Sequence, residues 1–361
     1  IIMLTKSQPQ ESTISLSKTI YRIMKKLHFW FLILFPACLF AQQYNVGEKS
    51  FSLTDISRNR AIKVEMWYPT SETDLTGERK TELPFMLKPT IRDAKFINQK
   101  SPLVILSHGS GGNRFSLAWL AIALARQGYV VAAPDHWGGT FDNMIPAYYI
   151  RYWERPLDIS FVLTTILADT SLSSLVDRDK IGALGYSFGG YTSLALAGAD
   201  IDCSILKKNA KTPQGKKEFY IPQLGDLRKI IDTLPCNKTE TTFKDKRIKA
   251  FVALAPGLGL GFETMEQTKN VNAPILIFAA ADDQVAPVNT NAAMYHSLIP
   301  TSKFILLPEK TSHYVFLNEG SETLKKEAKQ LFTDDKTISR NKIHNTIGSE
   351  VISFFEQTLK K

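Results

Sequence analysis

The 361-residue sequence is poor in cysteine, with three, and it contains six histidines. These residues form no cluster with the spacing of metal ligands, which a structural zinc site requires. The chain has no internal repeat and no low-complexity tract, and the apolar run near its N-terminus is too short to span a bilayer comfortably. We therefore predict neither a metal site nor a cofactor.

Positive charge is present but is not arranged for nucleic-acid binding. The formal net charge is +9, from 44 Lys and Arg against 35 Asp and Glu, yet the sequence has no continuous basic stripe and no recognisable nucleic-acid-binding motif. The excess is local, because residues 204–247 contain eleven Lys or Arg against five Asp or Glu. This pattern favours a basic, solvated surface on one segment over a nucleic-acid interface.

The N-terminal segment has the pattern of an export signal. Residues 24–41 combine a basic start, an apolar run and a small final residue, Ala41. We predict that this segment is a signal peptide, that residues 1–23 are an over-extended start, and that the mature chain begins at Gln42. The protein is then exported, either periplasmic or extracellular. The alternative is a lipoprotein anchored through Cys38.

From residue 101 onward, short apolar runs alternate with amphipathic stretches, which indicates a parallel sheet covered by helices on both faces. Runs at 51–54 and 62–68 predict an antiparallel pair at a sheet edge. The fold class is therefore α/β, with residues 42–361 as one domain and an insert at about 200–247. The expected strands are 103–107, 129–134, 180–186, 248–255, 274–280 and 304–307, and the expected helices are 114–127, 155–168, 187–199, 288–298 and 348–359.

One strand-to-helix junction has the pattern of a nucleophile. Gly185 and Gly189 flank Ser187, with an apolar run before them and a helix of small residues after them. In such an elbow the serine occupies a strained turn that exposes its hydroxyl, and the glycines let strand and helix approach closely. Because Gly and Ser are also common in ordinary loops, the prediction that Ser187 is a nucleophile depends on this strand-helix context.

Loops at the carboxyl ends of parallel strands are where ligands bind. The glycine-rich segment 107–112 follows the first parallel strand, and its backbone N–H groups could stabilise an oxyanion together with that of Phe188. His313 follows the last strand. The strand 274–280 is followed by two candidate acids, Asp282 and Asp283. The five other histidines lie in the predicted signal, upstream of these acids, inside a helix or, for His344, far from any strand end. We therefore predict His313 as the base, third in the order Ser, Asp, His.

Cys203 and Cys236 bracket most of the insert and could pair in an oxidising compartment, with two free thiols as the alternative. Closing a loop of that size would stabilise the fold by about 3 to 4 kcal/mol. The insert leaves the sheet after the nucleophile helix and returns in the next strand, so we expect a cap near Ser187. Its basic excess would favour anionic esters such as phospholipids.

Several further motifs extend the pattern along the chain from about residue 46 to the C-terminus. They are 67–69 (WYP), 106–109 (LSHG), 133–136 (APDH), 155–159 (RPLDI) and 185–191 (GYSFGGY). With them the sequence resembles an α/β-hydrolase, most of all the secreted enzymes grouped as predicted dienelactone hydrolases. It is more distantly similar to platelet-activating-factor acetylhydrolases and cutinase-like polyesterases.

The resemblance implies an acid four residues before a proline, which corresponds to Asp283 and Pro287, with Asp282 as the alternative. True dienelactone hydrolases use a cysteine nucleophile, whereas this chain has Ser187. The name of the group therefore does not indicate the substrate.

The predicted activity is hydrolysis of a small or short-acyl carboxylic ester through an acyl-enzyme intermediate. The backbone N–H groups of Phe188 and Ser110 are expected to hold the oxyanion. Two alternatives stay open, an amidase or peptidase with the same triad and a non-catalytic binding module on the same fold. The expected partner is a small-molecule ester, with a lipid surface as a further possibility.

Overall fold

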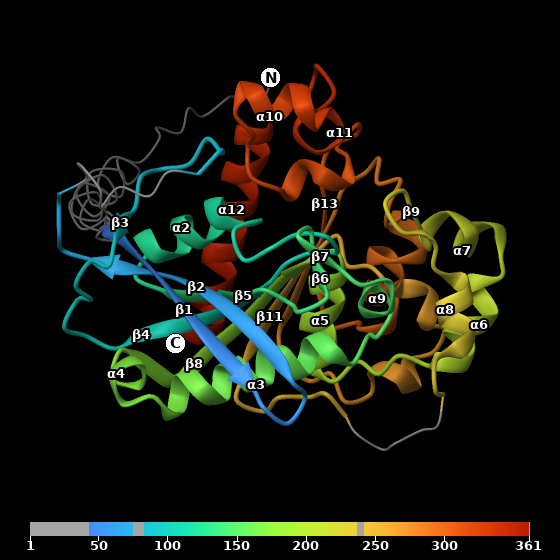
Figure 1. The fold of residues 1–361 in the computed structure, drawn as a ribbon, viewed down its shortest axis with the longest axis horizontal. Helices are drawn as coiled ribbons and strands as arrows, with labels where there is room; N and C mark the ends of the chain where they lie inside the picture. Colours follow the sequence, from blue (N-terminus) through green and yellow to red (C-terminus); the bar gives the residue numbers. More distant parts are fainter. Residues whose placement is uncertain (1–42, 75–82, 237–241, 361) are drawn as a thin grey trace, which may run out of the picture. The chain divides into compact units, whose positions relative to one another are not determined.

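A nine-stranded sheet runs through residues 43–74, 83–236 and 242–360, which the computed structural model describes (Figure 1). The strand order is β13-β12-β11-β8-β4-β5-β2-β1-β3. The strands are β1 (Asn45–Asp55), β2 (Arg60–Thr70), β3 (Ile91–Arg92), β4 (Ser101–Ser107), β5 (Val130–Pro134), β8 (Val176–Tyr186), β11 (Ala250–Leu254), β12 (Ile275–Ala279) and β13 (Lys303–Leu306). The predicted signal peptide, residues 1–23 and Cys38 lie outside the described residues.

Six strands, from β13 to β5 in the sheet order, pair in parallel, whereas β2 is antiparallel to both β5 and β1. The predicted α/β-hydrolase fold with a mostly parallel sheet is thus confirmed. The antiparallel pair is longer than predicted, with eleven residues in each strand. It does not form the outermost edge, because β3 pairs in parallel with β1 there.

Helices cover both faces of the sheet (Figure 1). On one face, α2 (Ala118–Arg126) and α12 (Arg340–Leu359) pack against side chains such as Val104 and Leu106. On the other face, α3 (Glu154–Ala168) and α5 (Phe188–Ala197) pack against their sequence neighbours Leu103 and Ile105. Because successive side chains of a strand point to opposite faces, a strand covered on both faces must be apolar throughout.

Three predicted helices differ from the observed ones. The helix α12 begins at Arg340 and not at 348, because Ile343, His344 and Ile347 are buried at helical spacing. The helix α2 begins at Ala118 and not at 114, since residues 114–117 form turns. The stretch 288–298 is divided into η5 (Val288–Thr290) and α9 (Ala292–Leu298), because the intervening Asn291 has non-helical dihedral angles.

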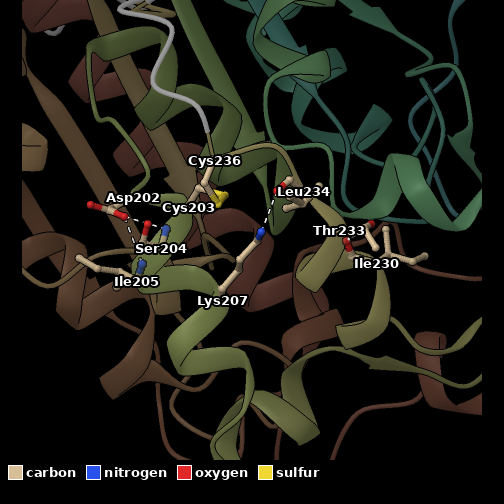
Figure 2. The surroundings of a disulfide bond; sticks show 9 residues. All are labelled: Asp202, Cys203, Ser204, Ile205, Lys207, Ile230, Thr233, Leu234 and Cys236. Atoms are coloured by element: carbon tan, nitrogen blue, oxygen red, sulfur yellow. Dashed lines mark hydrogen bonds between the residues drawn. A yellow bond between two sulfur atoms is a disulfide. The ribbon is translucent and has the colours of Figure 1, made fainter.

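The insert between α5 and β11 consists of short elements. They are α6 (Cys203–Ala210), α7 (Pro213–Glu218), β9 (Tyr220–Ile221), β10 (Gly225–Asp226) and α8 (Arg228–Thr233). A disulfide joins Cys203 to Cys236, with the two Cα atoms 5.3 Å apart (Figure 2). Beside it, the Lys207 ammonium donates to the Leu234 carbonyl at 2.8 Å, so this basic side chain has a partner within the insert (Figure 2).

The remaining short elements connect the main ones. They are β6 (Gly139–Thr140), β7 (Asn143–Met144), η2 (Pro146–Tyr149), α4 (Thr170–Ser173), η3 (Gly259–Gly261), η4 (Met265–Thr268), η6 (His313–Phe316), α10 (Glu322–Glu327) and α11 (Lys329–Phe332). Within the described ranges, no helix is both long and apolar enough to cross a membrane.

Candidate active site

Ser187 lies at the sharp turn between β8 and α5. Its φ of 56° and ψ of −119° are strained for a residue with a side chain. A Cβ atom on Gly185 would lie 1.9 Å from the Gly189 carbonyl oxygen, and one on Gly189 would lie 2.0 Å from that of Ser107. Both contacts are impossible, so the two glycines of the motif are required for strand and helix to meet at this angle.

The structure brings Ser187, His313 and Asp283 into one hydrogen-bonded chain. The His313 Nε2 atom is 3.0 Å from the Ser187 hydroxyl, and its Nδ1 atom is 2.6 Å from an Asp283 carboxylate oxygen. The other Asp283 oxygen accepts the N–H groups of Val285 and Ala286 at 2.9 and 2.7 Å. Because the carboxylate holds Nδ1–H, the lone pair on Nε2 faces the serine.

Asp282, the alternative acid, has a different environment. Its side chain is exposed, and one of its carboxylate oxygens accepts a hydrogen bond from the Gln284 amide at 2.7 Å. Its neighbour Asp283 is 4% exposed and contacts His313. Of the two carboxylates, the geometry thus favours Asp283.

The segment that contains His313 is held by three side chains from other elements. The Tyr186 hydroxyl donates to the His313 carbonyl at 3.0 Å, and the Trp119 indole N–H donates to the Phe316 carbonyl at 2.8 Å. The His344 Nε2 atom is 2.8 Å from the Val315 carbonyl, and its ring stacks on Trp119 with centroids 3.8 Å apart. Burial lowers the pKa of His344 to about 4, so the ring is neutral at physiological pH.

His344 was excluded as the base in the sequence because it lies far from any strand end, and the closing helix was expected only from residue 348. The signal that could have found it is the apolar spacing of Ile343, Ile347 and Val351, which extends the helix backward by two turns and puts residue 344 beside its buried face.

The loop predicted to hold an oxyanion, residues 107–112, which we call the oxyanion loop, lies against Ser187. A Cβ atom on Gly109 would be 3.2 Å from the Ser187 Cβ, so the loop backbone is in contact with the elbow. Phe188 is the first residue of α5, where backbone N–H groups have no acceptor within the helix. The β6–β7 hairpin, which the sequence did not predict, braces the loop, because the Gly111 N–H donates to the Gly139 carbonyl at 3.0 Å.

A second Ser–His–Asp chain lies behind the oxyanion loop. The Ser107 hydroxyl is 2.8 Å from His136 Nε2, and His136 Nδ1 is 2.9 Å from an Asp158 oxygen. Arg60 binds both Asp158 oxygens, at 2.7 and 2.6 Å. Ser107, His136 and Asp158 are at most 2% exposed, so this chain cannot meet a substrate and supports the loop instead.

The sequence motifs 106–109, 133–136 and 155–159 each contain one residue of this second chain, but their spacing gave no reason to connect them. The last of these motifs also supplies Arg155, a fully buried guanidinium that donates to the His108 carbonyl at 2.5 Å and lies 4.3 Å from the centre of the Phe188 ring. Burial lowers the pKa of Arg155 to about 9, which leaves it charged at neutral pH.

The insert contacts the site from the side of the acid. Glu218 accepts hydrogen bonds from Thr290 at 2.7 Å and from Asn291 at 3.1 Å. Asn291 in turn accepts the Gly259 N–H at 2.8 Å, close to Gly257, whose N–H donates to the Ser187 carbonyl at 3.0 Å. The disulfide-bonded insert is thus bonded, through Asn291, to the same short segment, residues 257–259, that bonds the Ser187 backbone.

The basic side chains of the insert are partly neutralised. Lys208 forms an ion pair with Glu263 at 2.9 Å, and Lys211 lies 3.5 Å from Asp232. In the described ranges, no group of three or more His, Cys, Asp or Glu side chains is arranged to hold a metal ion.

Comparison with known proteins finds similarity to proteins named as an acetylhydrolase, a cutinase and a ferulic acid esterase. Residues 81–140 match the family described as platelet-activating factor acetylhydrolase, isoform II, a match that includes the oxyanion loop and ends before Ser187. The chain is 24% identical over 199 residues to Cutinase est1 of Thermobifida alba, covering 55% of this chain and 48% of the cutinase. The alignment therefore spans about half the length of that relative.

Among solved structures, a ferulic acid esterase from Streptomyces cinnamoneus is similar with a TM-score of 0.59 and 20% identity. The similarity covers 89% of this chain and 92% of that one, and at this identity it shows the fold alone. The comparisons confirm the predicted resemblance: the chain has an α/β-hydrolase fold, and parts of its sequence are similar to acetylhydrolases and to a cutinase.

Proposed function

We propose that this protein is a serine ester hydrolase that cleaves a small or short-acyl carboxylic ester through an acyl-enzyme intermediate. The observation that supports it most is the continuous hydrogen-bonded chain from Ser187 through His313 to Asp283. The family match and the two similar proteins are named as acetylhydrolase, cutinase and ferulic acid esterase, which favours an ester as the substrate.

In the proposed reaction, His313 Nε2 takes the Ser187 hydroxyl proton while Oγ attacks the ester carbonyl carbon. Asp283 keeps the proton on Nδ1 and stabilises the imidazolium that forms. The protonated His313 then gives its proton to the leaving alcohol. Water, activated by the same histidine, attacks the acyl-serine and releases the acid.

The N–H groups of Phe188 and Ser110 are the proposed oxyanion donors. Both belong to the segments that border Ser187, one at the start of α5 and one in the loop that contacts the elbow. Each donor of this kind contributes about 3 kcal/mol to transition-state stabilisation.

We further propose that the protein is exported. The disulfide between Cys203 and Cys236 supports this, because such bonds persist mainly in oxidising compartments. Intact-mass analysis of secreted protein tests the proposed N-terminus at Gln42, and a lipid-modified mass beginning at Cys38 would support the anchored alternative instead.

The decisive experiment measures fluorophosphonate labelling and p-nitrophenyl acetate hydrolysis in the wild type, in Ser187→Ala and in Ser193→Ala. Ser193 is a matched control, because it lies on the same helix and is 1% exposed. We expect Ser187→Ala to lose labelling and at least about 10⁴-fold in kcat, with Ser193→Ala close to wild type. Turnover retained in Ser187→Ala contradicts the proposal.

The same assay separates the alternatives. A p-nitroanilide with the same acyl group, cleaved faster than the ester, would indicate an amidase or peptidase. A folded wild type that neither labels nor hydrolyses either substrate would indicate a binding module.

A further inference from the structure

Two consecutive carbonyl groups of the oxyanion loop are each held by a buried donor. The His108 carbonyl accepts from Arg155 at 2.5 Å. The Gly109 carbonyl is 2.7 Å from the His108 Nδ1 atom and accepts the Gly112 N–H at 3.1 Å. The peptide planes on both sides of Gly109 are therefore fixed from inside the protein.

The hydrogen bonds of His108 also fix its tautomer. Its Nε2 atom accepts the backbone N–H of His136 at 3.0 Å, so Nε2 carries no proton. The proton of the neutral ring must then be on Nδ1, which donates it to the Gly109 carbonyl. Complete burial, together with the nearby His136 and the Arg155 charge, lowers the pKa of His108 well below its ordinary value and keeps the ring neutral.

The direction of the Ser110 N–H follows from these contacts. In a trans peptide the N–H points away from the carbonyl oxygen of the same plane. The oxygen of the plane that joins Gly109 to Ser110 points toward the buried donors, so the Ser110 N–H points to the opposite side of the loop. A Cβ atom on Gly109 would lie 3.2 Å from the Ser187 Cβ, so the peptide that carries this N–H begins beside Ser187.

We propose that His108 is a positioning residue of the oxyanion hole, which aligns and polarises the Gly109–Ser110 peptide by donating Nδ1–H to the Gly109 carbonyl. The inference rests on the proposed esterase mechanism and assigns a role in it to a histidine outside the triad. His136 acts through its backbone N–H, and its side chain is held by Asp158, which in turn is bound by Arg60.

Arg155 holds the preceding peptide of the same loop, which joins His108 to Gly109. It holds the His108 carbonyl and lies over the ring of Phe188, whose N–H is the second proposed donor. Among the described residues, its Nε and Nη2 atoms have no hydrogen-bond partner, so its single side-chain hydrogen bond is the one to the loop.

The test compares His108→Asn with His108→Gln. The asparagine amide is bonded to Cγ, as Nδ1 is in histidine, and can keep the donor to Gly109, whereas the glutamine amide lies one bond further out, near the Nε2 position. His296→Gln is the matched control, since His296 also bonds a neighbouring group through Nδ1, the Ser302 hydroxyl at 2.8 Å, and lies on α9. The readouts are kcat and KM for p-nitrophenyl acetate, the Ki of a trifluoromethyl ketone, and the unfolding midpoint.

We expect His108→Gln to lower kcat about 10- to 100-fold with little change in KM, because the lost alignment acts in the transition state. The trifluoromethyl ketone forms an oxyanion adduct with Ser187, so its Ki should rise by the same factor. His108→Asn should recover kcat to within about threefold of the wild type, and His296→Gln should leave both values unchanged.

A folded His108→Gln with wild-type kcat would overturn the inference, as would equal losses in Asn and Gln or a loss of kcat without a change in Ki. If the Gln variant does not fold, ¹⁵N NMR of the wild-type enzyme decides, since the inference requires a neutral His108 ring with its proton on Nδ1. Failure of the proposed function differs from all of these outcomes, because the wild type itself would then show neither labelling nor turnover.

Discussion

The loops on the two sides of Ser187 are held in place by different kinds of interaction. The oxyanion loop rests on buried charge, in which Arg60 and Asp158 form a bidentate ion pair and Arg155 holds a carbonyl. The loop of His313 is held by neutral donors, among them the Tyr186 hydroxyl and the His344 ring.

The difference has an energetic consequence. A buried ion pair adds little net stability, but removing one partner leaves an uncompensated charge and is strongly destabilising. A neutral hydrogen bond contributes about 1 kcal/mol, and several of them in parallel share the task. We call the surroundings of residues 107–112 the oxyanion side and those of His313 the base side. Removing one charge from the oxyanion side should therefore cost much stability at once, whereas removing single hydrogen bonds from the base side should cost a little each time.

The largest expected effect concerns Asp283, the proposed acid that bonds His313. Asp283→Asn should lower kcat by about 10⁴-fold, because the amide stabilises the wrong tautomer of His313. Asp282→Asn should change kcat by less than about threefold, since Asp282 is exposed and bonds Gln284. Steady-state hydrolysis of p-nitrophenyl acetate measures both, and the reverse ranking would move the acid by one residue.

The second-largest effect tests the buried ion pair of Arg60 and Asp158 behind the oxyanion loop. Asp158→Asn should lower the free energy of unfolding by about 3 to 5 kcal/mol, because it removes the carboxylate that Arg60 binds with two hydrogen bonds and leaves this buried guanidinium with only Glu154, 3.5 Å away, as a counter-charge. Asp177→Asn is the control, since Asp177 forms a partly exposed ion pair with Lys180 at 3.7 Å and the substitution should cost at most about 1 kcal/mol. Urea unfolding of both variants is the measurement, and equal losses would remove the contrast between buried and exposed charge.

The third effect depends on pH. Burial lowers the pKa of His344 from 6.5 to about 4, so the unfolded chain binds a proton more readily than the folded one. Stability from this residue is therefore complete above pH 6.5 and is lost as pH falls toward 4, by about 3 kcal/mol in total.

His344→Gln isolates this contribution, because the glutamine amide can keep the donor to the Val315 carbonyl but does not titrate. The fall in unfolding free energy between pH 7 and pH 4.5 should be smaller in the variant than in the wild type. The same fall in both proteins would mean that His344 is not the group responsible.

The chain of Ser187, His313 and Asp283 could be predicted from the sequence to a greater extent than the supporting chain of Ser107, His136 and Asp158. Ser187 was predicted because its environment is local, a strand, two glycines and a helix within a few residues. His313 followed from chain order and strand ends. The structure brings both side chains together with Asp283, whose assignment depended on the family resemblance.

The supporting chain could not be predicted in the same way. Ser107, His136 and Asp158 come from β4, from the loop after β5 and from α3, and no spacing along the sequence relates them. Their pairing is a result of strand order in the sheet, which puts β4 beside β5. Similarly, Asn291 interrupts a helical pattern through contacts with Glu218 and Gly259 that exist only in the folded chain.

The smallest expected effect tests one of the neutral hydrogen bonds that hold the loop of His313. Tyr186 is 3% exposed, and its hydroxyl donates to the His313 carbonyl at 3.0 Å. Tyr186→Phe keeps the ring and removes this one bond, so it should cost about 1 kcal/mol of unfolding free energy. The loss in kcat/KM should stay below about fivefold, because Asp283 still orients the imidazole and other bonds still hold the loop.

Urea unfolding and ester hydrolysis of Tyr186→Phe, measured beside Asp158→Asn, decide whether the two sides differ as argued. If removing one neutral bond costs as much stability as removing the buried carboxylate, the base side is as cooperative as the oxyanion side. The kind of interaction would then not explain how the loops are held. A small loss in Tyr186→Phe beside a large loss in Asp158→Asn is the result that buried charge on one side and shared neutral bonds on the other require.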